Sequence, residues 1–273
     1  MSDVVTLTLR APVARRLEAE CITPDAFAAL DEDDIARLPL WDGPQMVALG
    51  DVFQVRGGRS AAVRVAGDCA MIDAIGAGMA GGDLRVDGAV GRYAGTRMAG
   101  GTLRVAGNAG DGAGLEMAGG LLDIAGSAGD RLGAGRLAGA RGMLGGEIVV
   151  RGNAGAEIGA AMRRGTVVVA GNAGPRAGIG MIAGNVIVFG SAGEDPGRFN
   201  KRGTIVVLGR VTVPATYVYD CTYRPPHLAV TFVHLRAHRG LPIGDPAEYT
   251  AVRRHSGDMA ELGRGELLTR SDR

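Results

Sequence analysis

"VVVAGNAGPRAGIGMIAGNVIVFG", residues 167–190, holds one complete unit of the pattern that organises this chain. Two apolar runs, each closed by a glycine (Gly171 and Gly190), bracket the unit. Between them lies 178–183, GIGMIA, a near-copy of the Gly-x-Gly-x-x-Gly spacing found at 76–81. A dinucleotide-binding loop requires a helix after such glycines, whereas both copies run into a strand pattern. These glycines therefore belong to a repeat and not to a nucleotide site.

The repeat has a period of 19 residues. The closing glycine returns at steps of 19, 19, 26, 19, 19 and 19, as Gly88, Gly107, Gly126, Gly152, Gly171, Gly190 and Gly209. The one long step carries a seven-residue insertion, and a looser copy around Val65 and Gly67 brings the count to about eight coils. Further glycines recur three and seven residues after each of the first six closing glycines, where corners need positive φ or close backbone approach.

Each unit contains two apolar residues spaced two apart, which places both on one face of a strand. These pairs are Leu84/Val86, Leu103/Val105, Leu122/Ile124, Ile148/Val150, Val167/Val169, Val186/Val188 and Ile205/Val207. A unit of this length spans about 60 Å of extended chain, too little for a four-stranded propeller blade, and it has no helical periodicity. We therefore expect an all-β fold, a three-sided, right-handed parallel β-helix of about eight 19-residue coils.

The flanks lack the repeat, so we divide the chain into an N-terminal cap (1–56), a Gly-rich β-helix (57–213) and a C-terminal segment (214–273). The cap begins with a strand from Val4 to Leu9 and contains a short helix capped at Thr23. The C-terminal segment reads as extended from Tyr217 to Leu235.

Two ladders follow from stacking the coils. Methionines share one position and are expected to fill the interior; they are Met98, Met117, Met143, Met162 and Met181. The position after the closing glycine holds Asn108, Ser127, Asn153, Asn172 and Ser191. At such a turn site asparagine tolerates the left-handed region and can stack amide on amide, so we predict a structural role.

The outward face of the strands changes character along the rod. Early coils place Arg85, Arg104 and Asp123 there, whereas later coils place Val149, Val168, Ile187 and Val206, with Phe189 and Leu208 beside them. Outward apolar residues need a cover. Either the C-terminal segment covers them or a partner does, and we predict an interface at Val168, Ile187, Phe189, Val206 and Leu208.

Composition and charge restrict the classes of function that this chain can have. The chain has 273 residues, 47 of them glycine, and a net charge of +1, which does not point to nucleic acid or an anionic membrane. No secretory leader or long apolar stretch is visible, so we expect a cytoplasmic protein. Three scattered cysteines indicate neither disulfides nor a zinc or iron–sulfur site.

The four histidines, all within 227–255, suggest no catalytic group. His234 and His238 would pair as metal ligands only on a helix, and residues 228–235 read as a strand. We therefore expect no metal site and no catalytic residue on this chain.

The repeat, the lead-in LGDVFQV (49–55) and the tail SGDMAELGRGE (256–266) resemble the C subunit of formylmethanofuran dehydrogenases. The resemblance covers nearly the whole chain. Within that family, the sequence looks most like the version found in methylotrophs. The repeat alone also resembles the C-terminal β-helix of the glutamate synthase large subunit, and this free-standing interaction domain is the alternative.

The formylmethanofuran dehydrogenase resemblance implies a non-catalytic scaffold in a formyltransferase/hydrolase complex of tetrahydromethanopterin-linked one-carbon metabolism. It implies three kinds of partner: an amidohydrolase-like A subunit, the B subunit, and a formyltransferase, the D subunit. A methanofuran-type cofactor would be handled by the complex, with no cofactor bound covalently or as a metal on this chain.

A local excess of arginine lies between Arg131 and Arg176, around the insertion. Arg131, Arg136 and Arg141 recur at five-residue spacing there. They are either ordinary surface and interface charges or, on the resemblance, a strip that holds the polyglutamate arm of the cofactor through guanidinium–carboxylate contacts.

Overall fold

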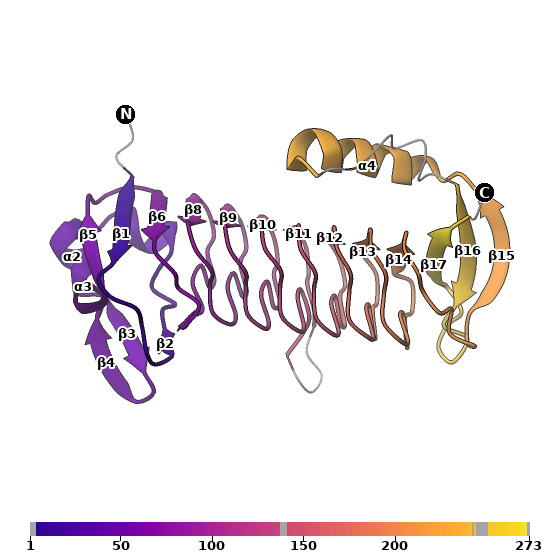
Figure 1. The fold of residues 1–273 in the computed structure, drawn as a ribbon, viewed down its shortest axis with the longest axis horizontal. Coiled ribbons are helices and arrows are strands. Elements are labelled where there is room, and N and C mark those ends of the chain that lie inside the picture. The colour runs from indigo at the N-terminus through magenta and orange to yellow at the C-terminus, as the bar shows by residue number, and fades with distance from the viewer. Residues whose placement is uncertain (1–3, 137–140, 242, 244–250, 272–273) are drawn as a thin grey trace.

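The structure, a computed structural model, describes residues 4–136, 141–241, 243 and 251–271. It is a rod with a small mixed cap at its N-terminal end, and a helix and a strand layer at its C-terminal end (Figure 1). No helix among the described residues is long and apolar enough to cross a membrane.

One side of the rod is a continuous sheet in which each coil contributes one short strand. These strands are β6 (Ala62–Ala66), β8 (Asp83–Val86), β9 (Thr102–Val105), β10 (Leu121–Ile124), β11 (Glu147–Val150), β12 (Thr166–Val169), β13 (Asn185–Val188) and β14 (Thr204–Val207). Every neighbouring pair is parallel, and equivalent residues of successive coils lie opposite each other. The predicted stack of parallel strands is confirmed.

The other two sides are narrower. One is a column of single parallel bridges between successive coils, formed by Cys69, Val90, Ala109, Ala128, Ala154, Ala173 and Ala192. Between β6 and β8 the chain also forms a two-residue strand, β7 (Ile72–Asp73). The third side is a turn whose backbone bonds to the preceding coil, as where Gly95 N–H donates to Ile75 C=O at 2.9 Å. Each coil thus has three sides, strand, bridge and turn, as predicted.

Two positions show why glycine recurs. The closing glycines lie where one coil touches the next, and a Cβ on Gly171 would stand 2.6 Å from the carbonyl oxygen of Gly152. Gly178 instead has φ +69°, which L side chains rarely adopt. The 19-residue pattern therefore records both close stacking and left-handed corners.

The asparagine and serine ladder is structural, but its bonds differ from the expected amide stacking. Each side-chain oxygen accepts the backbone N–H of the next ladder residue, as where Asn172 N donates to Asn153 Oδ1 at 2.8 Å. In the same way, Ser127 N–H donates to the Asn108 side chain, and Asn153 N–H donates to the Ser127 side chain. Ser191 N–H donates to the Asn172 side chain. None of these residues has positive φ, so the expected left-handed backbone is wrong. Asparagine is used here because its side chain reaches one coil along the rod.

The interior is one apolar cluster that runs through the whole rod. The five ladder methionines are fully buried in it, together with the paired strand residues such as Val167 and Val169. The predicted inward face and the interior position of the methionines are confirmed.

The N-terminal cap adds strands at the first coil. Its elements are β1 (Val5–Leu9), β2 (Leu17–Glu18), α1 (Pro24–Phe27), α2 (Glu32–Ala36), β3 (Pro39–Asp42), β4 (Gln45–Ala48), α3 (Leu49–Val52) and β5 (Phe53–Arg56). β1 pairs in parallel with β6 and antiparallel with β5, which ends the main sheet. The Thr23 side chain caps α1 by accepting the Ala26 N–H, as predicted.

At the other end the main sheet continues into β17 (Gly265–Arg270), β16 (Val252–Gly257) and the edge strand β15 (Val218–Tyr223). Between β15 and β16 the chain forms α4 (Pro226–Arg239), which lies along the later coils (Figure 1). The expected strand at 228–235 is therefore wrong. Leu228, Phe232 and Leu235 face the rod at helical spacing, so packing outweighs the β-branched composition.

Candidate interaction surfaces

The outward face of the sheet is charged in its first half and apolar in its second. The register puts one residue of each strand in a single row: Arg64, Arg85, Arg104, Asp123, Val149, Val168, Ile187, Val206 and Leu268. The arginines of this row are exposed, and its members from Val149 onward are buried. The predicted change of character is confirmed.

Helix α4 covers the apolar half. Leu228, Phe232 and Leu235 form a second apolar cluster with the buried row, joined by Leu208 and Leu241. The rings of Phe189 and Phe232 lie 5.4 Å apart between centroids. Of the two covers that the sequence allowed, the structure shows the intramolecular one. Val168, Ile187, Phe189, Val206 and Leu208 lie beneath α4 and do not present a bare face to a partner.

An ion-pair cluster lies at the end of α4, at the boundary between the two halves. Glu147 of β11 accepts from Arg239 Nη2 at 2.6 Å and lies 3.6 Å from His234 Nε2. Arg151 donates to the carbonyl oxygen of Arg239 at 2.9 Å and also pairs with Asp123. The helix thus stops where the row beneath it becomes charged.

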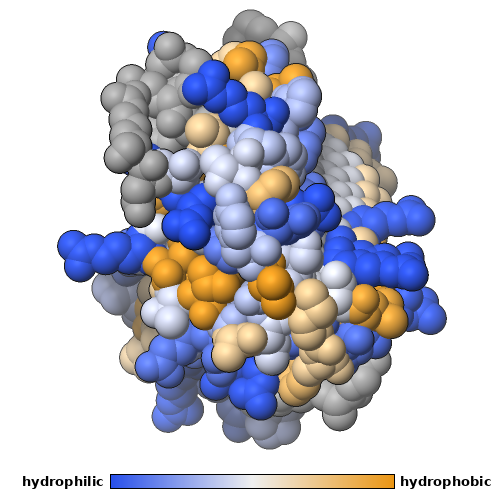
Figure 2. All heavy atoms as spheres, turned by 90° about the vertical axis from the view of Figure 1, so that its right-hand side faces the viewer, coloured by the Kyte–Doolittle hydropathy of each residue, from blue (hydrophilic) through white to orange (hydrophobic). Residues whose placement is uncertain are grey.

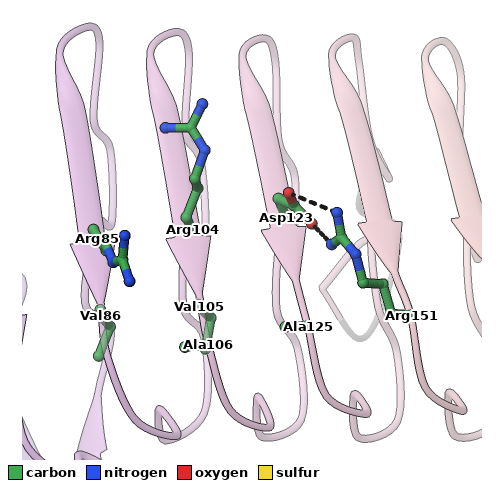
Figure 3. Close-up of a pocket in the computed structure, with 8 residues that line it drawn as sticks. All are labelled: Arg85, Val86, Arg104, Val105, Ala106, Asp123, Ala125 and Arg151. Carbon is green, nitrogen blue, oxygen red and sulfur yellow. Dashed lines mark hydrogen bonds and ion pairs between the residues drawn. The ribbon is translucent and has the colours of Figure 1, made fainter. Parts of the chain in front are cut away.

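Beyond that point the charged half is open, and a depression of about 220 Å³ lies over β8 to β10 (Figure 3). Its basic residues already have partners, because Arg85 bonds Asp87 and Arg104 bonds Asp83. Partial burial acts to raise the pKa of Asp87, but hydrogen bonds from Arg64 and Arg85 outweigh it, so that this pKa lies below its usual value. In this half of the sheet the arginines are paired with aspartates, so that little charge is left unpaired.

Of the three arginines predicted to guide the cofactor, two line a common pocket and the third does not. Arg131 lies 3.9 Å from Glu157 and donates to Gly135 C=O, and Arg136 lies 3.7 Å from Glu116. Both line an open pocket of about 470 Å³, whose lining also includes the acids Glu18, Glu20 and Asp73. Arg141 is exposed and is not part of that lining.

A second basic surface lies at the corner where each turn leads back into its strand. Arg163, Arg164 and Arg202 surround an open groove of about 670 Å³ together with Leu144, Ile182 and Ala183, and we name these six residues the turn groove. None of its three arginines has an ion pair or side-chain hydrogen bond within the described part of the chain.

The C-terminal end of the rod is apolar in part. Figure 2 shows apolar side chains exposed among charged ones on this end. Val218 and Tyr219 of the edge strand β15, and Met259 and Leu262 of the loop before β17, are each about half exposed.

His234 and His238 do lie on one helix, with ring centroids 5.2 Å apart. Their neighbour Glu147 is held by Arg239. Among the residues that the structure describes, no group of three or more metal-binding side chains is found.

Sequence reasoning missed two of these features. Arg202 lies outside the arginine-rich stretch. It lines the same groove as Arg163 and Arg164 because the stacking of the coils brings it within two coils of them. The Glu147–Arg239 pair spans 92 residues and has no local signal. The repeat register could have found Arg202, since it occupies the position of Arg164 two units later.

No protein-family model matches this chain. A chain in the crystal structure of the formyltransferase/hydrolase complex FhcABCD from Methylorubrum extorquens, with methylofuran, superposes with a TM-score of 0.90 and 36% identity. The match covers 98% of this chain and 100% of that chain. The C subunit of a molybdenum-containing formylmethanofuran dehydrogenase from Methanosarcina barkeri is 39% identical over 98 residues. The chain belongs to the family of formylmethanofuran dehydrogenase C subunits.

Within this family of C subunits, the one from the formyltransferase/hydrolase complex Fhc of Methylorubrum extorquens is 38% identical over 87 residues. The aligned segments cover 34% and 32% of this chain. They span about a third of the length of these two curated relatives, 32% and 33%. The structural match extends the family likeness to the N-terminal cap and the C-terminal segment.

Proposed function

We propose that this chain is a non-catalytic structural component of a formyltransferase/hydrolase complex. In that complex a formyl group would pass from tetrahydromethanopterin to a methanofuran-type cofactor and then be released as formate. The observation that carries the proposal is the whole-length match, at 36% identity, to a chain that was solved inside such a complex.

The shape of the chain supports a scaffold role. A stacked rod of this kind presents long, rigid rows of side chains, and neighbouring coils repeat about every 4.8 Å. Its interior is filled by apolar residues, which leaves no room there for a substrate. Three partners, an amidohydrolase-like A subunit, the B subunit and a formyltransferase D subunit, would bind its outer faces.

We extend the proposal to the polyglutamate arm of the cofactor, with Arg131, Arg136 and Arg141 as its contacts. Paired guanidinium and carboxylate groups suit such an arm. Two of these arginines already meet acidic residues, Glu157 and Glu116. The arm would therefore exchange with existing ion pairs, which favours loose guidance over tight binding.

Affinity purification of the tagged chain from its native host, at low ionic strength, tests the complex. We expect amidohydrolase-like and formyltransferase proteins to co-purify in fixed ratios. Recovery of the chain alone, as the free-standing alternative predicts, would count against the proposal.

A further inference from the structure

The arginines of the turn groove have no ion-pair partner within the described residues, whereas most other arginines of the arginine-rich stretch do. Arg131, Arg136, Arg151 and Arg176 each lie within ion-pair distance of a carboxylate. Arg163, Arg164 and Arg202, by contrast, have no such partner within the described residues and are exposed. Lys201, the one lysine of the sequence, occupies the position of Arg163 two units later and lies 3.7 Å from Glu261.

The fold itself brings the three charges together. Arg163 and Arg164 donate their backbone N–H groups to Met143 C=O, and Ala183 donates in the same way to Met162 C=O one coil later. Arg202 follows at the same position of the next coil. Arg164 and Arg202 are thus two coils apart, about 10 Å at a rise of 4.8 Å per coil. Three positive charges on one face of the rod attract an anionic partner.

Apolar side chains lie beside the charges. Ile182 is half-buried between Arg163 and Lys201 in one row, and Leu144, 38% exposed, precedes Arg163 in that row by one coil. A binding partner made only of carboxylates would leave these side chains unused. A protein segment that combines acidic and apolar residues would use both.

The dimensions fit an extended segment. A polyproline-II-type strand presents the same face every three residues, about 9.3 Å. Acidic residues three apart on such a segment can therefore meet Arg164 and Arg202, with an apolar residue between them over Ala183 and the adjacent Ile182.

Two other occupants fit less well. Nucleic acid would need a longer basic track, and the chain as a whole has a net charge of only +1. A second copy docked through the same groove would place arginine against arginine. The acidic run of this chain is also engaged, since Asp31 caps α2 and Glu32 accepts from Gly57 N–H.

We propose that the turn groove docks an extended acidic segment of a neighbouring subunit. The proposal rests on the proposed function only for the identity of that neighbour. The arginines supply paired hydrogen bonds to carboxylates, and Leu144 and Ile182 supply the apolar contacts of the interface.

The test is assembly of the full-length chain, co-expressed with the other components of the complex. The variant R163E/R164E/R202E is expected to lower the yield of co-purified partner at least about tenfold at physiological ionic strength. The control R56E/R210E/R224E changes the net charge equally at exposed arginines elsewhere and is expected to match wild type. Thermal unfolding of the purified chains checks that the fold is intact. The milder variant R163Q/R164Q/R202Q, which removes the charges without reversing them, is measured in the same way.

A photo-crosslinking residue at Ile182 then identifies the occupant. The expected product is a peptide rich in Asp and Glu from one partner protein. A crosslinked peptide without acidic residues, crosslinked RNA, or a second copy of this chain would overturn the proposal, as would normal assembly of the charge-reversed variant. If wild type itself gathers no partners, the proposed function fails. If the complex forms and the turn groove variants do not affect it, only this inference fails.

Discussion

At the residue scale, successive coils are joined by side chains that accept a hydrogen bond from the backbone of the next coil. Asn153 accepts the N–H of Asn172 at 2.8 Å, and an alanine there would leave that N–H to water. We expect Asn153→Ala to lower the free energy of unfolding by about 1 kcal/mol, measured by urea denaturation. Asn185→Ala, at an exposed strand position, is the control and should change little.

Asp258 is the residue through which pH should act on the C-terminal end. It is almost fully buried, and its oxygens accept the N–H groups of Phe199 and Ala260 at 2.8 and 2.9 Å. Burial acts to raise the pKa of Asp258, but the hydrogen bonds from Ala260 and Phe199 outweigh it and leave the pKa below its usual value. The ionised carboxylate therefore stabilises the fold.

A carboxyl whose pKa is lowered on folding stabilises above its unfolded pKa, about 3.9 for Asp, and loses this contribution as the pH falls through the folded value. We expect Asp258→Asn to cost about 1–3 kcal/mol at neutral pH and progressively less below about pH 4. Urea denaturation across that range measures it, with the exposed Asp195→Asn as control. A difference that is constant with pH would show that ionisation of Asp258 is not the cause.

At the element scale, α4 decides whether the apolar half of the sheet is covered. Phe232 is fully buried against Phe189, and large-to-small changes at such sites cost about 3–5 kcal/mol. We expect Phe232→Ala to speed amide hydrogen exchange in α4 and leave the strands of the early coils unchanged. Val233→Ala, on the exposed side of the same helix, should not affect exchange. Uniformly faster exchange along the rod would contradict a helix that docks on a preformed sheet.

How much the sequence could predict follows from the range of the interactions. The parallel stack was predictable because the closing glycines and apolar pairs repeat one coil apart. Helix α4 was not, because residues 228–235 are rich in β-branched side chains and their helical state depends on Val168 and Ile187, distant in sequence. The arginine-rich stretch was visible, but which of its charges are paired depends on Glu116 and Glu157 in other coils.

At the scale of the whole molecule, the rod separates surfaces of different kind. α4 covers one half of the sheet (Figure 1), and arginines of the charged half are paired with carboxylates. The turn groove and the partly apolar C-terminal end (Figure 2) remain open. Such separated surfaces suit a scaffold that contacts more than one partner.

The proposed guidance of the cofactor arm is tested in the assembled complex. We expect R131A/R136A/R141A to raise the apparent KM for the polyglutamylated cofactor and to make that KM less dependent on salt. R56A/R210A/R224A serves as the control. An unchanged KM and salt dependence in a normally assembled complex would assign these arginines to the surface alone.

We propose that this chain helps to build a formyltransferase/hydrolase complex and does no chemistry itself. The most direct measurement is formyl transfer and formyl hydrolysis by the purified chain, by its partner proteins without it, and by the reconstituted set. We predict no turnover by the chain alone, full turnover by the complete set, and a loss of assembled, active complex when the chain is omitted. Turnover by the isolated chain, or full activity of the partners without it, would contradict the account.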